Sequence, residues 1–332
     1  MLGRRVRRPG TVMAVVPWVM LVLLVGSSQL GAQERPRPSR LEAEPAKPSR
    51  RSIFPWSRSG KSRPSPEDYA KIVKKGSSSK VARQEAIAAL PMQRLQQETR
   101  RSVLDLVDKT GLFRQMPTIA VDVERDVYDY FSVHPDAAVS VWRALKISKF
   151  QMKQTGENTY ESDAGDGTVG NVEVLLRTPT EQLVFCEGVY KSPLLLKPIR
   201  AKALLHLRAE FRNGASGRTQ ATHRVALFVS FPSQTVETAA RVISPVSNII
   251  VDRNFHEVSL FLHMMSLAMV RQPRWVDGVV EKMEGVPEAR KTELRRVTAH
   301  VYTAGRRRSQ SGVRAASATK PPTRVGRRPA SR

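Results

Sequence analysis

Residues 199–231 read IRAKALLHLRAEFRNGASGRTQATHRVALFVSF, which is two alternating runs joined by a loop of small and polar residues. In the first run, one set of alternate positions is apolar and the other is mostly charged. The apolar set is Ala201, Ala203, Leu205, Leu207, Ala209 and Phe211, and the other set includes Arg200, Lys202, His206, Arg208, Glu210 and Arg212. A period of two places each set on one face of a strand. The run therefore predicts an antiparallel sheet with one apolar face and one face in solvent.

The second run, 221–231, has to turn its apolar residues to the same side of the sheet. These residues are Val225, Leu227, Val229 and Phe231. A shift of the pairing by one residue would expose all of them. The pairing can therefore shift only by an even number of residues. A five-residue loop at 213–217 meets this condition and also turns His223 inward, near Leu207. The predicted cross-strand pairs are Leu205–Val225, Ala203–Leu227 and Ala201–Val229.

Four more strand-like runs precede this hairpin. They span 149–154, 158–162, 169–177 and 182–190. Short connections rich in Gly, Asn, Asp and Pro separate them, which is typical of antiparallel neighbours. Together with the hairpin they predict a six-stranded meander. An earlier alternating run, TIAVDV at 118–123, predicts one further strand.

Helical periodicity follows the hairpin. A short helix is predicted from Ser233 to Ile243, and Pro245 is expected to break it. A long helix is then predicted from about Asn248 to Arg271, with an apolar stripe and further apolar residues around most of its circumference. The stripe is Val251, Phe255, Val258, Leu262, Met265 and Met269. Such a helix is buried on more than one side, and a weaker pattern predicts another helix over 276–300.

The region from 66 to 112 also has helical signals. Pro66 suits a first turn and Gly76 a stop, while the serines before Lys80 can cap a second helix that runs to Ala89. A third helix is predicted from Pro91 to about Lys109, ended by Gly111. Between the strand at 118–123 and the meander, Asp126 and Pro135 open two short helices.

The first 32 residues have the order of a secretory signal peptide. Four arginines precede the apolar, charge-free run 12–25, and small and polar residues follow it up to Ala32. Fourteen apolar residues are short for a membrane span of roughly 20. We therefore expect export to the periplasm or medium, with an uncleaved inner-membrane anchor as the alternative. The Pro-, Arg- and Ser-rich stretch 33–65 is predicted to be a disordered linker.

The basic charge of the chain lies mostly outside the predicted domain. The chain carries 55 Lys and Arg against 30 Asp and Glu, a net charge of +25. Residues 1–100 hold 20 basic and 7 acidic side chains, and residues 303–332 hold nine basic and no acidic ones. The segment between them is close to neutral, which disfavours a nucleic-acid face on the domain. The tail 301–332 is predicted to be disordered, with loose attachment to an anionic membrane surface or polymer as its candidate role.

The sequence has no pattern for catalysis or for a resident metal or cofactor. Its single cysteine, Cys186, lies in the strand-like run LVFCEGVY, where a buried inert thiol is expected. His256 and His263 share a helix face, but a zinc protease needs histidines four apart. Phosphate-binding glycine loops and nucleophile elbows do not occur. We assign no catalytic residue, metal ligand or cofactor, and we leave open whether the chain is an enzyme, with binding favoured.

The order of elements over about 115–272 resembles the START-like, or helix-grip, superfamily. It consists of a strand, helices, a six-stranded antiparallel meander and a long apolar helix. The resemblance rests on the long final hairpin and the Met-rich helix after it. It implies an α+β domain at 113–300 in which a curved sheet of six to seven strands grips the long C-terminal helix. The helices of 66–112 are extra to that pattern.

The resemblance implies that the protein binds a lipid or other apolar small molecule in a cavity between sheet and helix. His223 is the candidate polar contact, and Glu187 is its partner if the two strands face the same way. The full candidate ligand-binding set is His223, Glu187, Phe185, Leu227, Phe255, Leu262 and Met265. Two alternatives remain: an envelope structural protein held to anionic polymer or membrane by its basic tails, and a hydrolase or cyclase that uses the cavity.

Overall fold

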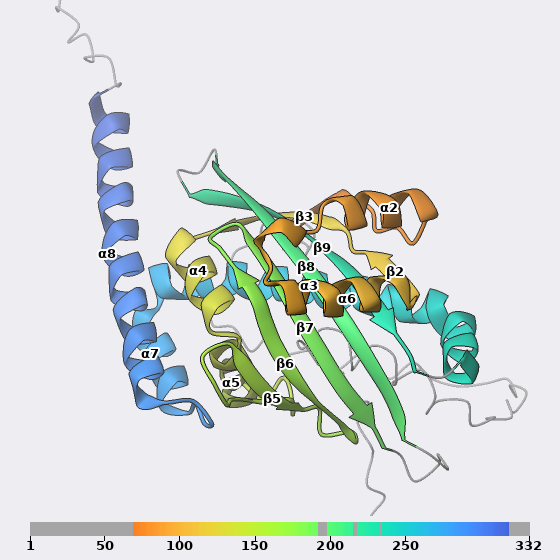
Figure 1. Ribbon diagram of the computed structural model, residues 1–332. Coiled ribbons are helices and arrows are strands. Elements are labelled where there is room, and N and C mark those ends of the chain that lie inside the picture. Colours follow the sequence, from red (N-terminus) through yellow and green to blue (C-terminus); the bar gives the residue numbers. More distant parts are fainter. Residues whose placement is uncertain (1–68, 192–197, 215–217, 233, 319–332) are drawn as a thin grey trace, which may run out of the picture.

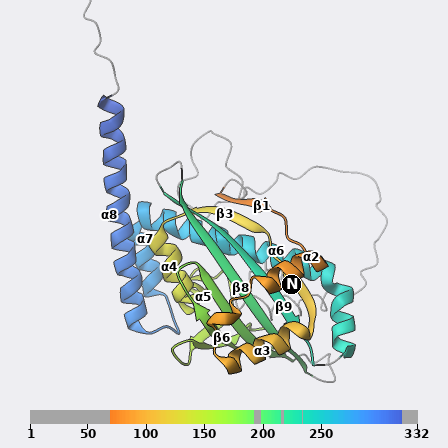
Figure 2. The same cartoon turned by 45° about the horizontal axis from the view of Figure 1, so that its top comes forward.

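The computed structural model describes residues 69–191, 198–214, 218–232 and 234–318, and in this part the chain is an α+β domain (Figures 1 and 2). A nine-stranded antiparallel sheet has helices on both faces. The predicted signal peptide, the linker, and the part of the tail after 318 lie outside the described residues. No helix in the described ranges combines the length and apolar character needed to cross a membrane.

The predicted meander and the strand before it are confirmed. The strands are β3 (Thr118–Val123), β4 (Gln151–Gln154), β5 (Thr159–Asp163), β6 (Thr168–Arg177), β7 (Glu181–Tyr190), β8 (Ile199–Asn213) and β9 (Thr219–Ser230). Hairpin neighbours pair in sequence from β4 to β9, and β3 lies along the other edge of β9. The turn residues and the period of two were therefore sufficient to locate these strands.

The predicted register of the last hairpin is wrong by two residues, although its parity is right. Leu207 pairs with Val225 and Leu205 with Leu227, and the loop is displaced to 214–218. His223 lies opposite Ala209, whose small side chain leaves room for the inward-facing imidazole. Alternation alone cannot distinguish registers that differ by two, because both keep the apolar residues on one face.

Two strands were missed, and they bring the sheet from the predicted six or seven strands to nine. The predicted first helix is instead β1 (Ala70–Lys74), which pairs with β3, and the segment after Lys109 is β2 (Thr110–Gln115), which pairs with β9. β1 is exposed at four of its five positions, so its own pattern carries little strand signal. Its conformation comes from pairing, which overrides local propensity.

Three helices cover the inner face of the sheet. They are α4 (Arg125–Val133), α5 (Pro135–Ala144) and α6 (Gln234–Arg271). The predicted apolar stripe of α6 packs against the sheet in the main core. Pro245 does not separate two helices as expected, because α6 is continuous through it, and the first part of α6 runs at a steep angle to the rest (Figures 1 and 2). A proline inside a helix commonly bends it without ending it.

The outer face is not fully in solvent, which corrects the prediction of one wet face. The helices α2 (Lys80–Ala88) and α3 (Gln97–Asp108) lie across it. They form a second core whose buried members are Ala86, Leu90, Leu95, Val103, Leu106, Val107, Leu183, Leu204, Ala226 and Phe228. His206, predicted to face water, is buried here and bonds Glu181 at 2.8 Å. Two of the helices predicted within 66–112, α2 and α3, therefore cover the outer face of the sheet.

The C-terminal prediction of one helix over 276–300 and a disordered tail from 301 is also corrected. The structure has α7 (Pro273–Glu281) and α8 (Glu288–Ala318), with Gly285 between them at a φ of 76°. Beyond residue 300, Val301 is buried in the core and Arg308 donates to Glu124 at 2.5 Å. Composition predicted disorder in this segment, but contacts with α4 and α6 hold its first turns in place.

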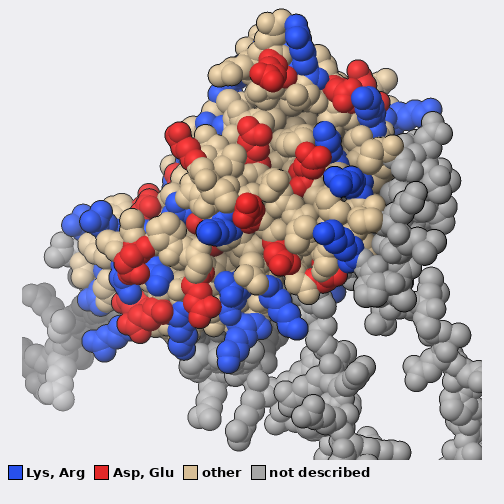
Figure 3. Space-filling model, turned by 60° about the horizontal axis from the view of Figure 1, so that its bottom comes forward, with Lys and Arg blue, Asp and Glu red and all other residues tan. Residues whose placement is uncertain are grey.

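The face of the molecule drawn in Figure 3 agrees with the near-neutral charge that the sequence gives for the middle of the chain. On the face shown in Figure 3, acidic and basic side chains are interspersed among uncharged residues. A nucleic-acid-binding face instead gathers Lys and Arg in one patch.

Candidate functional site

A cavity of about 140 Å³ lies between the inner face of the sheet and the helices α4, α5 and α6. Helices α4 and α5 contribute Tyr128, Phe131, Ser132, Pro135, Ala138 and Trp142; the sheet contributes Met152, Val172, Val174, Arg177, Gln182, Val184, Cys186, Leu205, Leu207, His223 and Val225; α6 contributes Phe255, Val258, Phe261 and Leu262. The lining is mostly aliphatic and aromatic, so the cavity suits an apolar occupant.

The Phe, Tyr and Trp side chains of the wall come from the three helices. Phe261 of α6 meets Phe131 edge to face at 5.0 Å between ring centroids, and meets Trp142 at 5.3 Å in the same way. These edge contacts fix α4 and α5 against α6. The sequence analysis assigned none of these three residues to a site, because one sequence does not show which helices meet.

The structure brings three of the seven predicted ligand-binding residues to the cavity: His223, Phe255 and Leu262. Leu227 and Met265 are buried in the same core but do not line the cavity.

Glu187 and Phe185 were placed on the wrong face of the sheet. In β7 it is Cys186 that faces inward, opposite Ala203, and its two neighbours therefore face outward. Glu187 is exposed, with its Oε1 3.9 Å from Lys202 Nζ, and Phe185 packs against the outer core. The predicted pairing of Glu187 with His223 is therefore wrong.

His223 is 2% exposed and both of its ring nitrogens are hydrogen-bonded. Nε2 lies 2.8 Å from Ser259 Oγ, and Nδ1 lies 3.2 Å from the Tyr128 hydroxyl. Because Ser259 Oγ itself donates to the Phe255 carbonyl, we assign the proton to Nε2 and let Tyr128 donate to Nδ1. Burial lowers the pKa of His223 to about 4. The imidazole is therefore a neutral, satisfied part of the wall.

Cys186 is the other chemically reactive group of the cavity. It is a free, buried thiol, and burial raises its pKa to about 12. A thiol that stays protonated is a poor nucleophile. The expectation of a buried thiol is confirmed, and the raised pKa agrees with the expected low reactivity.

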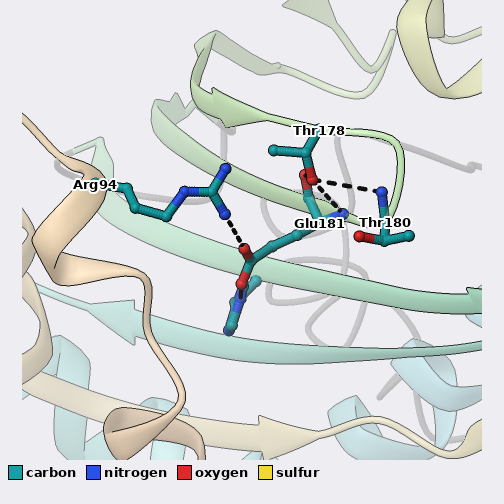
Figure 4. A network of polar contacts seen from close by, with 5 residues as sticks. Arg94, Thr178, Thr180 and Glu181 are labelled. Atoms are coloured by element: carbon teal, nitrogen blue, oxygen red, sulfur yellow. Dashed lines mark hydrogen bonds and ion pairs between the residues drawn. The ribbon is translucent and has the colours of Figure 1, made fainter.

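A more open hollow of about 390 Å³ adjoins the cavity. The residues that line both are Tyr128, Ser132, Arg177, Gln182 and Leu207. One rim of the hollow is the turn between β6 and β7, drawn in Figure 4. Thr178 Oγ1 accepts from the backbone N–H groups of Thr180 (3.4 Å) and Glu181 (3.0 Å), which fixes the turn. The hollow is the open mouth of the cavity, and polar side chains lie on part of its rim.

Two histidines considered for metal binding have other partners. His256 Nε2 lies 2.9 Å from the carbonyl oxygen of Ala70, and His263 Nδ1 lies 2.7 Å from that of Asp122. They tie α6 to β1 and β3. Within the described ranges, no three His, Cys, Asp or Glu side chains gather closely enough to hold a metal ion.

Comparisons with known proteins give only distant likenesses. No protein-family model and no curated protein sequence matches the chain. Among solved structures, a conserved protein from Geobacillus kaustophilus is 14% identical and covers 43% of this chain and 93% of its own, with a TM-score of 0.26. A putative uncharacterized protein from Rhizobium leguminosarum is 10% identical and covers 43% and 91%, also with a TM-score of 0.26. Likenesses at this level carry no argument about function.

Proposed function

We propose that this protein is an exported, START-like binding protein that holds a small apolar molecule between its sheet and α6. The observation that carries the proposal is the cavity of about 140 Å³, with mostly apolar walls from five strands and three helices. The aliphatic and aromatic part of the lining offers water no hydrogen-bond partner, so an apolar guest there replaces empty space and not bound solvent.

The size of the cavity narrows the class of ligand. An engineered apolar cavity of about 150 Å³ in another protein binds benzene. A chamber of about 140 Å³ therefore suits one aromatic ring or a short aliphatic chain. It is too small for the two acyl chains of a phospholipid, so among the apolar ligands expected from the sequence we favour the small ones.

The titratable groups of the chamber favour binding over catalysis. Both His223 nitrogens are engaged, and burial raises the pKa of Tyr128 as well as that of Cys186. General acid–base work needs a pKa near the working pH, and none of these three groups is shifted toward neutrality. Export through residues 1–32 and attachment through the basic ends remain parts of the proposal that rest on sequence alone.

Replacing Val184 by phenylalanine is expected to weaken toluene binding at least tenfold. Val184 lines the cavity from β7, and a phenyl ring there takes the volume that the guest needs. Isothermal titration calorimetry on the full chain measures the effect. Val169→Phe is the matched control, because Val169 lies in the neighbouring strand β6 and is 42% exposed.

Equal toluene affinity in wild type and Val184→Phe would place the binding elsewhere. Wild-type protein that does not bind toluene at all would remove the proposed function.

A further inference from the structure

Arg177 has an unused hydrogen-bonding fork at the mouth of the cavity. Its Nε and Nη2 are buried and have no hydrogen-bond partner. These two nitrogens form the side of a guanidinium that binds a carboxylate in bidentate fashion. Arg114 shows this geometry within the same protein, because its Nε donates to Asp252 Oδ1 at 3.0 Å and its Nη2 donates to Oδ2.

Two other partly buried arginines do not share this condition. Arg83 and Arg100 also have an unpartnered Nε, but in each the Nη2 donates to a backbone carbonyl, at 3.0 Å and 3.4 Å. Arg177 as a whole is partly exposed, but a buried N–H group without a hydrogen-bond partner is costly, and natural proteins keep few of them. The fork of Arg177 therefore requires an explanation.

A β-bulge turns Arg177 toward the cavity. Val174 pairs with Val184, but the next pair is Leu176 with Leu183, so Leu175 is an extra residue in β6. Without it, alternation would place Arg177 on the outer face. With it, Arg177 pairs with Gln182 and both line the cavity and its mouth. Bulges commonly redirect a side chain beside a functional site.

The carboxylates at the mouth are already occupied. Glu181 bonds Arg94 at 2.7 Å, shown in Figure 4, and also His206 at 2.8 Å. Asp129 receives both of its bonds from Arg125 Nε at 2.8 Å. In the described part of the chain Arg177 has no acidic partner, so the mouth has one cation available to a ligand.

We infer that Arg177 binds the carboxylate of a small apolar acid whose hydrocarbon part occupies the cavity. This inference rests on the proposed function and adds the ligand class to it. Nε and Nη2 of Arg177 make no hydrogen bond in this position. The side chain can therefore rotate toward a carboxylate in the mouth without losing a hydrogen bond from either atom. Ser132 and Gln182, which line the same junction, supply further polar contacts.

The test compares three probes by calorimetry on the full chain: phenylacetate, 2-phenylethanol and toluene. The variants are Arg177→Met, which keeps an unbranched apolar stem, and Arg177→Lys, which keeps the charge without the fork. Arg212→Met is the charge-matched control, because Arg212 is exposed on β8. We expect Arg177→Met to weaken phenylacetate binding about tenfold to a hundredfold and to leave the two neutral probes unchanged. The phenylacetate affinity of Arg177→Lys is expected to lie between those of wild type and Arg177→Met. Arg212→Met is expected to bind phenylacetate as tightly as wild type.

Each other outcome decides a different point. If the neutral probes bind but phenylacetate binds equally to wild type and Arg177→Met, the inference fails and the proposed function stands. If no probe binds, both fail. Stability without ligand is the second readout, and Arg177→Met is expected to unfold at the same or a higher urea concentration, since it removes two buried N–H groups that have no partner. A markedly lower midpoint would make Arg177 a structural residue and overturn the inference.

Discussion

Replacing Arg290 by methionine is expected to lower the free energy of unfolding by about 3–5 kcal/mol. The side chain of Asp136 in α5 is fully buried and bonds Arg290 of α8, whose own side chain is 11% exposed. Arg290 also donates to Gln154 Oε1 at 2.9 Å. Removing the guanidinium leaves a buried carboxylate without a counter-charge, which costs more than the contact itself contributes.

Urea unfolding, followed by circular dichroism, measures this effect. Arg295→Met is the matched control on the same helix, because Arg295 is 39% exposed and its nearest acidic oxygen, on Glu288, is 3.6 Å away. Exposed pairs of this kind contribute up to about 1 kcal/mol. Equal losses in the two variants would show that α8 is not anchored through Asp136. The double variant Asp136→Asn/Arg290→Met is expected to recover part of the stability.

Acidification from pH 7 to pH 4 is expected to cost about 3 kcal/mol of stability through His223 alone. Its pKa is lowered from 6.5 to about 4 in the folded protein because the ring is buried. The unfolded chain therefore takes up this proton first as the pH falls. The contribution is complete above pH 6.5 and is lost progressively between pH 6.5 and pH 4.

The variant His223→Gln isolates this contribution. A glutamine amide can accept from Tyr128 and donate to Ser259, but it does not titrate. The free energy of unfolding, measured against pH for both proteins, is expected to fall less steeply in the variant. Carboxylates and the other histidines contribute to both curves and cancel in the difference. Parallel curves would mean that His223 is not buried as a neutral ring.

Alternation and turn residues predicted much of the sheet but not its surroundings. The meander, the inward direction of His223 and the apolar stripe of α6 follow from local periodicity, which a single sequence displays. The outer core does not follow from local periodicity. Leu204 and Phe228 are buried there because α2 and α3 pack over them, and the pattern of one strand does not show which helices cover it. Strand β1 likewise exists through its pairing with β3.

A residue of the candidate site was predictable only where a regular repeat of apolar positions showed which face of its strand or helix it lies on. His223, Phe255 and Leu262 were found because each lies on a regular apolar face. Arg177 was missed because its direction depends on one extra residue in β6, and strict alternation assigns it to the outer face beside Glu173. Glu187 was misassigned because the relative face of two strands depends on the pairing of β7 with β8.

Soaking a crystal of the full chain with bromobenzene tests the central claim most directly, since the bromine can be located by its anomalous scattering. We expect one bromine site in the cavity, within contact distance of Phe131, Val184 and Phe255. Bromine found only on the surface, with the space between the sheet and α6 filled by protein side chains, would contradict the account.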